Sequence, residues 1–595
     1  MSKQKSLFET KFVPGKPGSG KLFDEEFVYE DVPVACLGIE FKNDTDRRNH
    51  FTKLLRERLK DPEFRKIEGF PIGEDEDILA ISDPPYYTAC PNPWMSDFIN
   101  DWEIQKSNKQ REEHYHREPF AVDVSEGRSG LFYDAHSYHT KVPFKAIMRY
   151  LLHYTNPGDV VFDGFCGTGM TGVAAQMCGD KETIESLGYR VEPDGTILNK
   201  ELTDGSDNPW KPISKIGIRK AILNDLSPAA TFIAYNYNTP INIDVYREEA
   251  ERILSEVEEE FGWMYETLHT DGKTIGKINY IIWSDVFICP ACTNELIFWD
   301  TAVNEQKGKI LEDFQCPKCN TMLSKMPANP KKEGGKKAQD RRPIAEKLER
   351  SWITRYDSEL KNTVKQVKQV PIRINYSIEN KKGRFEKKPD QSDLTLLKKI
   401  DRIDLKYKFP TTKIPKGDKT GEPINRGITH IHHFYTSRNL IILSALRGKV
   451  KNYTLVRQLL FLINSYDLTH STLMSRIIFK SGGKKPVLTG YQSGTLYIPS
   501  LPVEKNIIEG IRNRKLGIIL KSLSHVCENQ LISTNSSDRM AIPDDSVNYI
   551  FIDPPFGSNI MYSELNFLSE TWQSVLTNNQ QEAIENKTQS KSLED

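Results

Sequence analysis

The sequence predicts an α/β core that is interrupted by a cysteine module. Three observations support this prediction. The apolar run Val160–Phe162 leads into a glycine-rich turn and a helical segment, a second apolar run ends at Asp225, and two Cys-Pro-x-Cys pairs stand between residues 285 and 325. A strand, a glycine turn and a helix in this order favour a nucleotide-type binding site, because glycine lets the backbone bend sharply and lets a ligand lie against the amides.

Length and composition limit the class of protein. A chain of 595 residues should hold about two to four domains. The formal net charge of −1 means that any site for a polyanion must be a local patch. No run of 18 apolar residues and no apolar signal-peptide segment is present, so we expect a cytoplasmic protein without a membrane span. Nine cysteines are too few for a disulfide scaffold and suit a reducing compartment.

Local patterns predict the elements in order. Residues 77–82 predict a short strand, and the segment after Lys141 has helical periodicity. A turn then leads into a strand at 160–163 and a helix at 171–177. Further predicted elements are a polar insert at 179–216, a buried strand at 221–225, helices at 227–237 and 245–262, a buried strand at 546–552, a helix at 562–576 and a disordered polar tail from 578.

Two copies of Asp-Pro-Pro-aromatic stand far apart, at Asp83-Pro84-Pro85-Tyr86 and at Asp553-Pro554-Pro555-Phe556. An exocyclic amine on a purine or pyrimidine is a poor nucleophile, because its lone pair is delocalised into the ring. It needs acceptors for its two hydrogens and a flat surface that holds the base. A carboxylate, a proline carbonyl and an aromatic ring supply these. The motif therefore predicts methyl transfer to such an amine.

These motifs resemble those of the amino-methyltransferase class of DNA methyltransferases, which methylate adenine N6 or cytosine N4 with S-adenosylmethionine. Both copies match the family's catalytic motif. The turn at 163–169 resembles the donor motif, with Gly164 where proline is usual, and residues 136–143 resemble the segment that completes the methionine pocket. The resemblance covers residues 130–235 and 530–572 and implies a Rossmann-like core, with a flipped base and direct methyl displacement. The expected donor-binding residues are His136, Thr140, Asp163, Phe165, Cys166, Gly167, Thr168, Gly169 and Asp225, the last of these on the ribose hydroxyls.

The choice between the two Asp-Pro-Pro motifs stays open, with Asp553 favoured. The strand before Asp553 is the better one, and donor motif, insert, catalytic motif is a known order for the class. Asp83 would give a permuted order that is also known, or else a rigid proline turn. Few residues follow Asp553, so the strands that should come after it are supplied by the N-terminal part, or by a partner, or are missing from a truncated chain.

The cysteine pairs Cys289/Cys292 and Cys316/Cys319, 23 residues apart, predict a structural zinc site like that of a zinc ribbon, which some adenine methylases are described as carrying. Redox-active or metal-free cysteines are the weaker alternatives.

His430, His432 and His433 are not expected to bind metal, because no acidic or cysteine partner is close in the sequence. Between residues 320 and 390 there are 19 Lys/Arg against 9 Asp/Glu. The densest cluster is either a solvated linker or a phosphate contact, and comprises Lys331, Lys332, Lys336, Lys337, Arg341 and Arg342.

The chain is therefore interpreted as a zinc-containing DNA methyltransferase, with adenine N6 favoured over cytosine N4 by resemblance alone. DNA is the expected partner, and a restriction or other defence-system partner fits the class. The rivals are a non-catalytic zinc-dependent nucleic-acid-binding protein and an RNA or protein-glutamine methyltransferase. The expected divisions are an N-terminal region (1–125), a donor half (126–240), a helical connector (241–284), a zinc ribbon (285–325), a basic segment (326–425), a helical recognition region (426–530), a catalytic half (531–577) and a tail (578–595).

Overall fold

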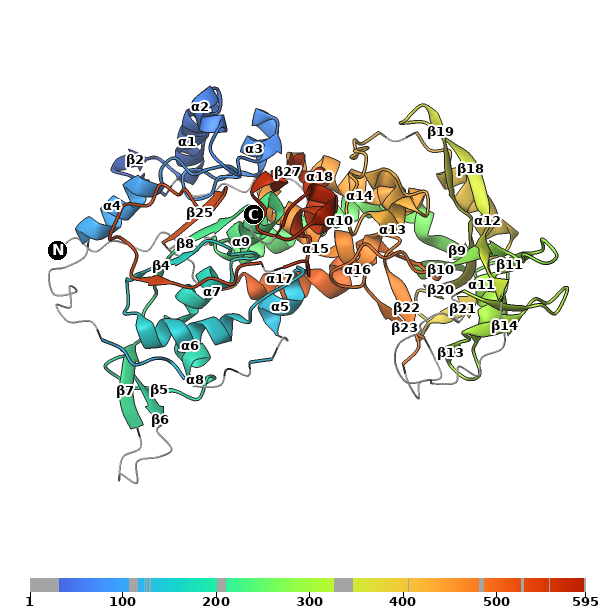
Figure 1. Ribbon diagram of the computed structural model, residues 1–595, viewed down its shortest axis with the longest axis horizontal. Helices are drawn as coiled ribbons and strands as arrows, with labels where there is room; N and C mark the ends of the chain where they lie inside the picture. Colours follow the sequence, from blue (N-terminus) through green and yellow to red (C-terminus); the bar gives the residue numbers. More distant parts are fainter. Residues whose placement is uncertain are drawn as a thin grey trace, which may run out of the picture.

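The computed structural model describes residues 32–105, 116–121, 124, 126–127, 130–200, 210–325, 346–404, 406–480, 486–525, 529–555 and 557–592. The molecule is elongated (Figure 1). A lobe built on a parallel sheet lies at one end, a helical body lies in the middle, and a β-rich lobe lies at the other end. No helix within these ranges is both long enough and apolar enough to cross a membrane.

The parallel sheet holds four strands in the order β25-β8-β4-β26. Their bounds are Val160–Asp163 for β4, Lys220–Asp225 for β8, Gln530–Thr534 for β25 and Tyr549–Ile550 for β26. The strands predicted at 160–163 and 221–225 are confirmed. The strand predicted at 546–552 is shorter than expected and is not buried, since Ile550 is 58% exposed.

Helices cover both faces of this sheet, so its strands read as apolar runs rather than as alternating patterns. On one face, Ile222 and Leu531 pack in a cluster with the side chains of α4 (Met95–Gln105). On the other face, β8 contacts α7 (Met170–Met177) and α9 (Pro228–Tyr237). The helices predicted at 171–177 and 227–237 are these two helices.

The N-terminal part begins with the hairpin of β1 (Val34–Cys36) and β2 (Ile39–Phe41), followed by the helices α1 (Asp44–Leu59), α2 (Pro62–Arg65) and α3 (Asp75–Ile81). The strand predicted at 77–82 is wrong, because this segment belongs to α3. Three acidic residues stand in the first turn of that helix, where the helix dipole favours negative charge. The extended segment comes later, where Tyr87 forms a parallel bridge to Ile532 at the edge of the sheet.

The predicted polar insert forms structure of its own. After α6 (Phe144–Tyr154) and α7 come α8 (Lys181–Glu185) and a three-stranded antiparallel sheet that projects from the lobe (Figure 1). Its strands are β5 (Arg190–Val191), β6 (Thr196–Lys200) and β7 (Trp210–Lys215).

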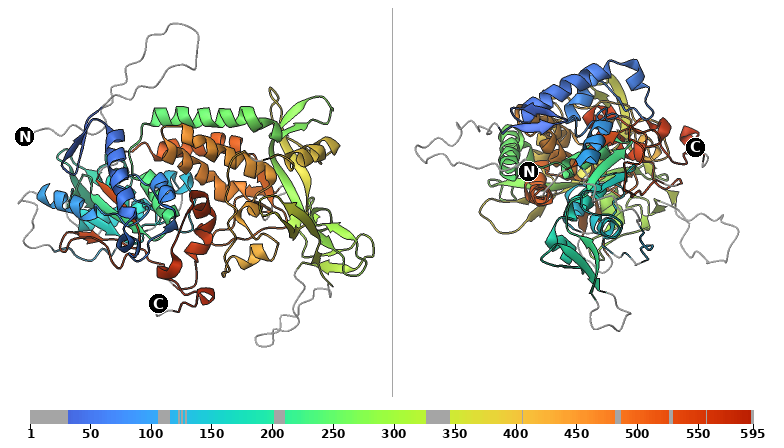
Figure 2. Two further views of the ribbon diagram at one scale, coloured as in Figure 1. Left: turned by 90° about the horizontal axis from the view of Figure 1, so that it is seen from above. Right: turned by 90° about the vertical axis from the view of Figure 1, so that its left-hand side faces the viewer.

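The helical body connects the two lobes, and Figure 2 shows its helices lying side by side between them. The longest of its helices is α10, which confirms the helix predicted at 245–262. The helices are α10 (Ile243–Phe261), α14 (Ser437–Lys449), α15 (Val456–Tyr466), α16 (Ile507–Gly510) and α17 (Gly517–Ser522).

The β-rich lobe is organised by β10, a strand of 14 residues. The strands β9, β11, β17, β20 and β24 all pair with it in antiparallel fashion. Their bounds are β9 Glu266–Leu268, β10 Ile275–Ile288, β11 Glu295–Ile297, β17 Glu349–Arg350, β20 Gln369–Ser377 and β24 Val503–Lys505. A separate hairpin is formed by β18 (Trp352–Asp357) and β19 (Asn362–Val367).

The C-terminal part returns to the parallel-sheet lobe. The helix predicted at 562–576 is confirmed as α18 (Tyr562–Gln573), and β27 (Val575–Leu576) pairs with β3 (Ile72–Gly73). The prediction of a disordered tail is wrong for residues 579–592. Asn586 is fully buried there and donates a hydrogen bond to Glu564 of α18 over 3.0 Å.

Candidate functional site

The glycine turn connects β4 to α7 at the carboxyl edge of the sheet. Gly167 and Gly169 both have left-handed backbone angles, with φ of +50° and +74°. A Cβ atom added at Gly169 would lie 2.7 Å from the Cβ of Ala234 and from Nδ2 of Asn238, both near the end of α9. Only glycine therefore lets α7 start this close to α9.

Two carboxylates hold the turn in place. Asp163 accepts hydrogen bonds from the Phe165 amide over 3.1 Å and from the Thr171 hydroxyl. Asp225, at the end of β8, accepts hydrogen bonds from the amides of Gly167 and Ser227, each over 2.9 Å. The turn and the ends of two neighbouring strands are thus joined through side-chain oxygens.

The surroundings of the turn are acidic. Burial raises the pKa of Asp163 to about 7, and the charges of Asp225 and Asp553 add to this effect. Burial likewise raises the pKa of Asp225 to about 6 and that of Glu570 to about 7. Glu570 accepts a hydrogen bond from the Ser227 hydroxyl over 2.6 Å. Such a set of carboxyl groups would be stabilised in its charged form by a cation.

The segment 136–140 lies against the turn and contacts α18. A Cβ atom at Gly167 would stand 3.6 Å from the Tyr138 ring. The Tyr138 hydroxyl accepts a hydrogen bond from Asn566 over 3.1 Å, and the hydroxyls of Thr140 and Tyr562 are 3.0 Å apart. The structure therefore brings this predicted segment to the predicted donor turn.

His136 takes a different position from the rest of its segment. Its ring stacks on Phe461 of α15, with ring centroids 4.9 Å apart, and its Nε2 atom has no hydrogen-bond partner among the described residues. Burial lowers its pKa to about 3, so the imidazole is neutral. His136 packs against the helical body at this point.

The second Asp-Pro-Pro motif follows β26, which pairs with β4. Because the two strands are parallel neighbours, Asp553 and Asp163 leave the sheet at the same edge. The negative charge of Asp553 acts on both Asp163 and Tyr562, whose pKa values are raised by burial and by neighbouring carboxylates. Asp553 and Pro554 are exposed. Phe556 lies outside the described residues.

In the first Asp-Pro-Pro motif, neighbouring arginine side chains already occupy the hydrogen-bond acceptors. Asp83 is buried and accepts hydrogen bonds from the guanidinium groups of Arg47 and Arg48, over 3.1 and 2.8 Å. Arg47 also donates to the Pro84 carbonyl over 2.7 Å, and its guanidinium lies 4.8 Å from the centre of the Tyr86 ring. Burial alone would raise the pKa of Asp83. The positive charges of Arg48 and Arg47 outweigh burial and hold this pKa far below its usual range.

A contact with α9 completes the environment of Asp83. Its second oxygen accepts a hydrogen bond from the Tyr235 hydroxyl over 2.9 Å. The structure therefore brings together Asp163, Asp225 and Asp553, and it places Asp83 in the interior between α1 and α9.

The four predicted cysteines converge in the β-rich lobe, although 23 residues stand between Cys292 and Cys316 in the sequence. The Sγ atoms of Cys289 and Cys319 are 3.7 Å apart, as are those of Cys292 and Cys316. A tetrahedral zinc ion with Zn–S bonds of about 2.3 Å requires sulfur atoms roughly 3.8 Å apart. The two pairs at 3.7 Å match the spacing of a tetrahedral zinc site, and all four sulfur atoms lie within 4.8 Å of one another.

Two further predictions concern the basic cluster and the histidines. The basic cluster from Lys331 to Arg342 lies outside the described residues. The histidines that were expected to lack an acidic partner have one, because Asp357 lies against His432 and His433. A single sequence gave no signal for this contact, since Asp357 lies 75 residues before His432.

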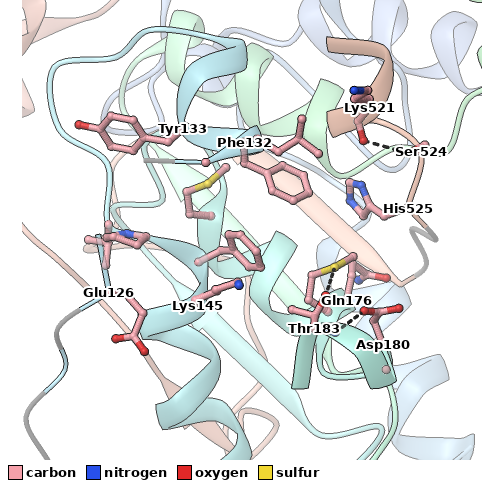
Figure 3. A pocket seen from close by; sticks show the side chains of 18 of the residues that line it. Glu126, Phe132, Tyr133, Lys145, Gln176, Asp180, Thr183, Lys521, Ser524 and His525 are labelled. Atoms are coloured by element: carbon pink, nitrogen blue, oxygen red, sulfur yellow. Dashed lines mark hydrogen bonds between the residues drawn. The ribbon is translucent and has the colours of Figure 1, made fainter. Parts of the chain in front are cut away.

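A cavity of about 750 Å³ lies beside α7, away from the carboxylates of the turn. Figure 3 shows Phe132, Gln176, Lys145 and His525 around it. Its lining includes neither the carboxylates of the turn nor Asp553. The cavity therefore does not mark the place where the predicted donor and catalytic motifs meet.

Comparison with known proteins gives a family match over part of the chain. Residues 39–222 match the model of a protein family described as DNA methylase. The match covers 184 of the 595 residues and supports, over that part of the chain, a similarity to the amino-methyltransferase class of DNA methyltransferases. No curated protein and no solved structure matches. The matched range includes the first Asp-Pro-Pro motif and the glycine turn, but it ends long before the second motif.

Proposed function

We propose that the protein transfers a methyl group from S-adenosylmethionine to the exocyclic amine of a flipped base in DNA, with Asp553 in the catalytic motif. One observation supports this above the others. Asp163 ends β4 and Asp553 follows the neighbouring parallel strand β26, so the two carboxylates lie at one edge of the sheet. Open α/β sheets bind their ligands at the carboxyl ends of their strands.

The residues around the turn fit such a donor. S-adenosylmethionine would supply an electrophilic methyl group on a positively charged sulfur. Asp163, Asp225 and Glu570 provide negative charge for a cation, and glycine at 167 and 169 lets a ligand lie against the backbone. The acceptor capacity that Asp225 keeps beyond its bonds to backbone amides suits a ribose hydroxyl.

The second motif would position the amine. The Asp553 carboxylate and the Pro554 carbonyl accept its two hydrogens and so direct its lone pair towards the methyl group. The aromatic ring of Phe556 would hold the base by stacking. In the first motif the corresponding carboxylate and carbonyl already accept hydrogen bonds from Arg47 and Arg48. That motif serves as a buried proline turn that supports the sheet edge.

The DNA contact is proposed to lie in the basic segment 326–425, within which the β18–β19 hairpin carries suitable side chains. Trp352, Ile353 and Tyr356 are exposed on β18, and the Lys365 ammonium lies 5.2 Å from the centre of the Trp352 ring. A two-stranded antiparallel ribbon fits the major groove of DNA, and lysine pairs with phosphate. Structural zinc at the four cysteines would hold the adjoining lobe together.

The test is labelled methyl transfer from S-adenosylmethionine to unmethylated DNA and to RNA of the same sequence, followed by identification of the modified nucleoside. We expect N6-methyladenine in DNA; N4-methylcytosine would change the target base only. Asp553→Ala should abolish transfer but keep donor binding by calorimetry. Full turnover of Asp553→Ala would refute the site, and transfer only to RNA would favour an RNA methyltransferase.

A non-catalytic nucleic-acid-binding protein on a methyltransferase scaffold is the second candidate. The exposed Asp553 loop and the short β26 are the features that favour it, because a catalytic clamp has to hold its base firmly. It predicts DNA binding without heat of donor binding. A partner nuclease of a restriction or defence system stays a prediction from the resemblance alone.

A further inference from the structure

A second group of metal-binding side chains lies outside the site described above. Asp357, His432 and His433 are all buried, and one ligand atom from each lies within 4.8 Å of the others. The Nε2 atoms of both imidazoles are 2.8 Å from the same carboxylate oxygen, Oδ2 of Asp357. Two histidines and one carboxylate therefore converge on one point.

The backbone fixes this convergence. Oδ1 of Asp357 accepts hydrogen bonds from the amides of Glu359 and Leu360, each over 3.1 Å, which leaves Oδ2 turned towards the histidines. Asp357 is the last residue of β18, and both histidines lie in the short 3₁₀ helix Ile431–Phe434 that precedes α14. The ligand atoms thus come from two segments that are far apart in the sequence.

The histidines are chemically ready to act as ligands. An imidazole binds a metal ion in its neutral form, through the lone pair of one ring nitrogen. The Nδ1 atom of His432 is buried and has no hydrogen-bond partner among the described residues. Hydrogen bonding inside the cluster therefore leaves part of this ring unsatisfied.

The distances are close to those of a metal site. A tetrahedral zinc ion with bonds of about 2.0–2.1 Å places its ligand atoms roughly 3.3 Å apart. The side chains would have to separate by about half an ångström from their present 2.8 Å contacts. A set of two imidazoles and one carboxylate suits zinc and other divalent first-row metals.

We propose that Asp357, His432 and His433 bind a divalent transition-metal ion, with zinc as the best fit and water in the remaining position. The ion joins the β18–β19 hairpin to the helical body. It is distinct from the ion expected at the four cysteines. His430 stays outside this set of ligands, because its Nδ1 atom is hydrogen-bonded to the Thr429 hydroxyl over 2.9 Å.

The experiment measures metal per chain on the full-length protein after dialysis against zinc, by elemental analysis. We expect two ions in the wild type, one in Asp357→Asn and one in Cys316→Ser. The matched control His430→Gln should keep both. With cobalt, Cys316→Ser should lose the thiolate-to-metal charge-transfer band and keep the weaker ligand-field bands, whereas Asp357→Asn should keep the charge-transfer band.

Asn in place of Asp357 keeps the Oδ1 acceptor for the two amides, so the turn can form without the charge. One ion in the wild type that is lost in Cys316→Ser would overturn the proposal, even if the Asp357 variant did not fold. Two ions in both the wild type and Asp357→Asn would overturn it as well.

Discussion

The Tyr235 hydroxyl donates a hydrogen bond to the Asp83 carboxylate over 2.9 Å, in the interior of the parallel-sheet lobe. This contact joins α9 to the turn that carries the first Asp-Pro-Pro motif. Together with Arg47 and Arg48 it uses both oxygens of the carboxylate. Two motifs that share Asp-Pro-Pro therefore differ in environment: Asp83 is buried and Asp553 is exposed.

Asp83→Asn should lower the free energy of unfolding by about 3–5 kcal/mol, because it removes the buried carboxylate that pairs with Arg47 and Arg48 and leaves the half-exposed Asp44 as the partner of both. Denaturant unfolding measures the change. The control Asp553→Asn, at an exposed position, should change stability by less than about 0.5 kcal/mol. Equal effects of the two substitutions would contradict the distinction.

Gly169→Ala should cost more stability than Gly188→Ala. Both positions have positive φ, of +74° and +90°, so backbone strain of about 1–3 kcal/mol applies to each. A Cβ atom would meet Ala234 and Asn238 at 2.7 Å only at Gly169, while Gly188 faces open space. Thermal unfolding measures the difference, and S-adenosylmethionine affinity should fall for Gly169→Ala alone. An equal loss in both variants would show that α7 can move away from α9.

Donor binding should strengthen as pH rises from about 5 to 8. The pKa of Asp163 is raised from 3.8 to about 7 in the folded protein, so the fold favours the protonated acid. Its stabilising contribution is therefore fully present below about pH 4 and is lost as pH rises towards 7. A bound cation would stabilise the ionised Asp163 carboxylate and so offset this loss of stability. The positively charged donor should therefore raise the unfolding temperature more at pH 8 than at pH 5. Asp163→Asn should flatten this dependence, and an unchanged dependence would point to another group.

Chelation should loosen the β-rich lobe. Removing zinc from four converged thiolates leaves buried Cys289 and Cys316 without their ligand bonds. We expect a strong chelator to lower the unfolding temperature and to expose this module to limited proteolysis. Cys316→Ser should show the same sensitivity without chelator, whereas Cys36→Ala, in another lobe, should not. Purified protein without any zinc would refute the assignment.

The β18–β19 hairpin should contribute to DNA affinity in two separable ways. Lys365→Ala should weaken binding and reduce the slope of log affinity against log salt by about 1, since one phosphate contact is lost. Trp352→Ala should weaken binding without changing that slope. Lys181→Ala, on α8 in the other lobe, is the charge-matched control. Unchanged affinity in both hairpin variants would place the DNA contact elsewhere.

Features that depend on neighbouring residues in the sequence could be predicted. The strand and turn around Gly167 and Gly169 could be predicted because glycine is needed at positive φ. The cysteine pairs could be predicted because each pair brings two ligands close together. The segment Asp75–Ile81 forms a helix and not the predicted strand, because a short apolar run fits either state; three acidic residues in the first turn favour the helix.

Contacts between distant segments could not be predicted from one sequence. Nothing near Asp357 indicates that it meets His432, and nothing near Asp83 indicates the guanidinium of Arg47. The same limit applied to the two Asp-Pro-Pro motifs, because their residue types are equal and only their neighbours differ. Tertiary packing determines which side chains surround each Asp-Pro-Pro motif, and therefore which of the two motifs is buried.

The adjacency of β8 and β25 has a consequence for biosynthesis. Ala221 pairs with Gln530, so the outer neighbour of β8 leaves the ribosome roughly 300 residues later. Until then the nascent chain carries a strand edge with open amides and carbonyls, which is a template for unwanted pairing. The lobe made first is thus completed last, and a high demand for chaperones during synthesis follows from the order of the strands.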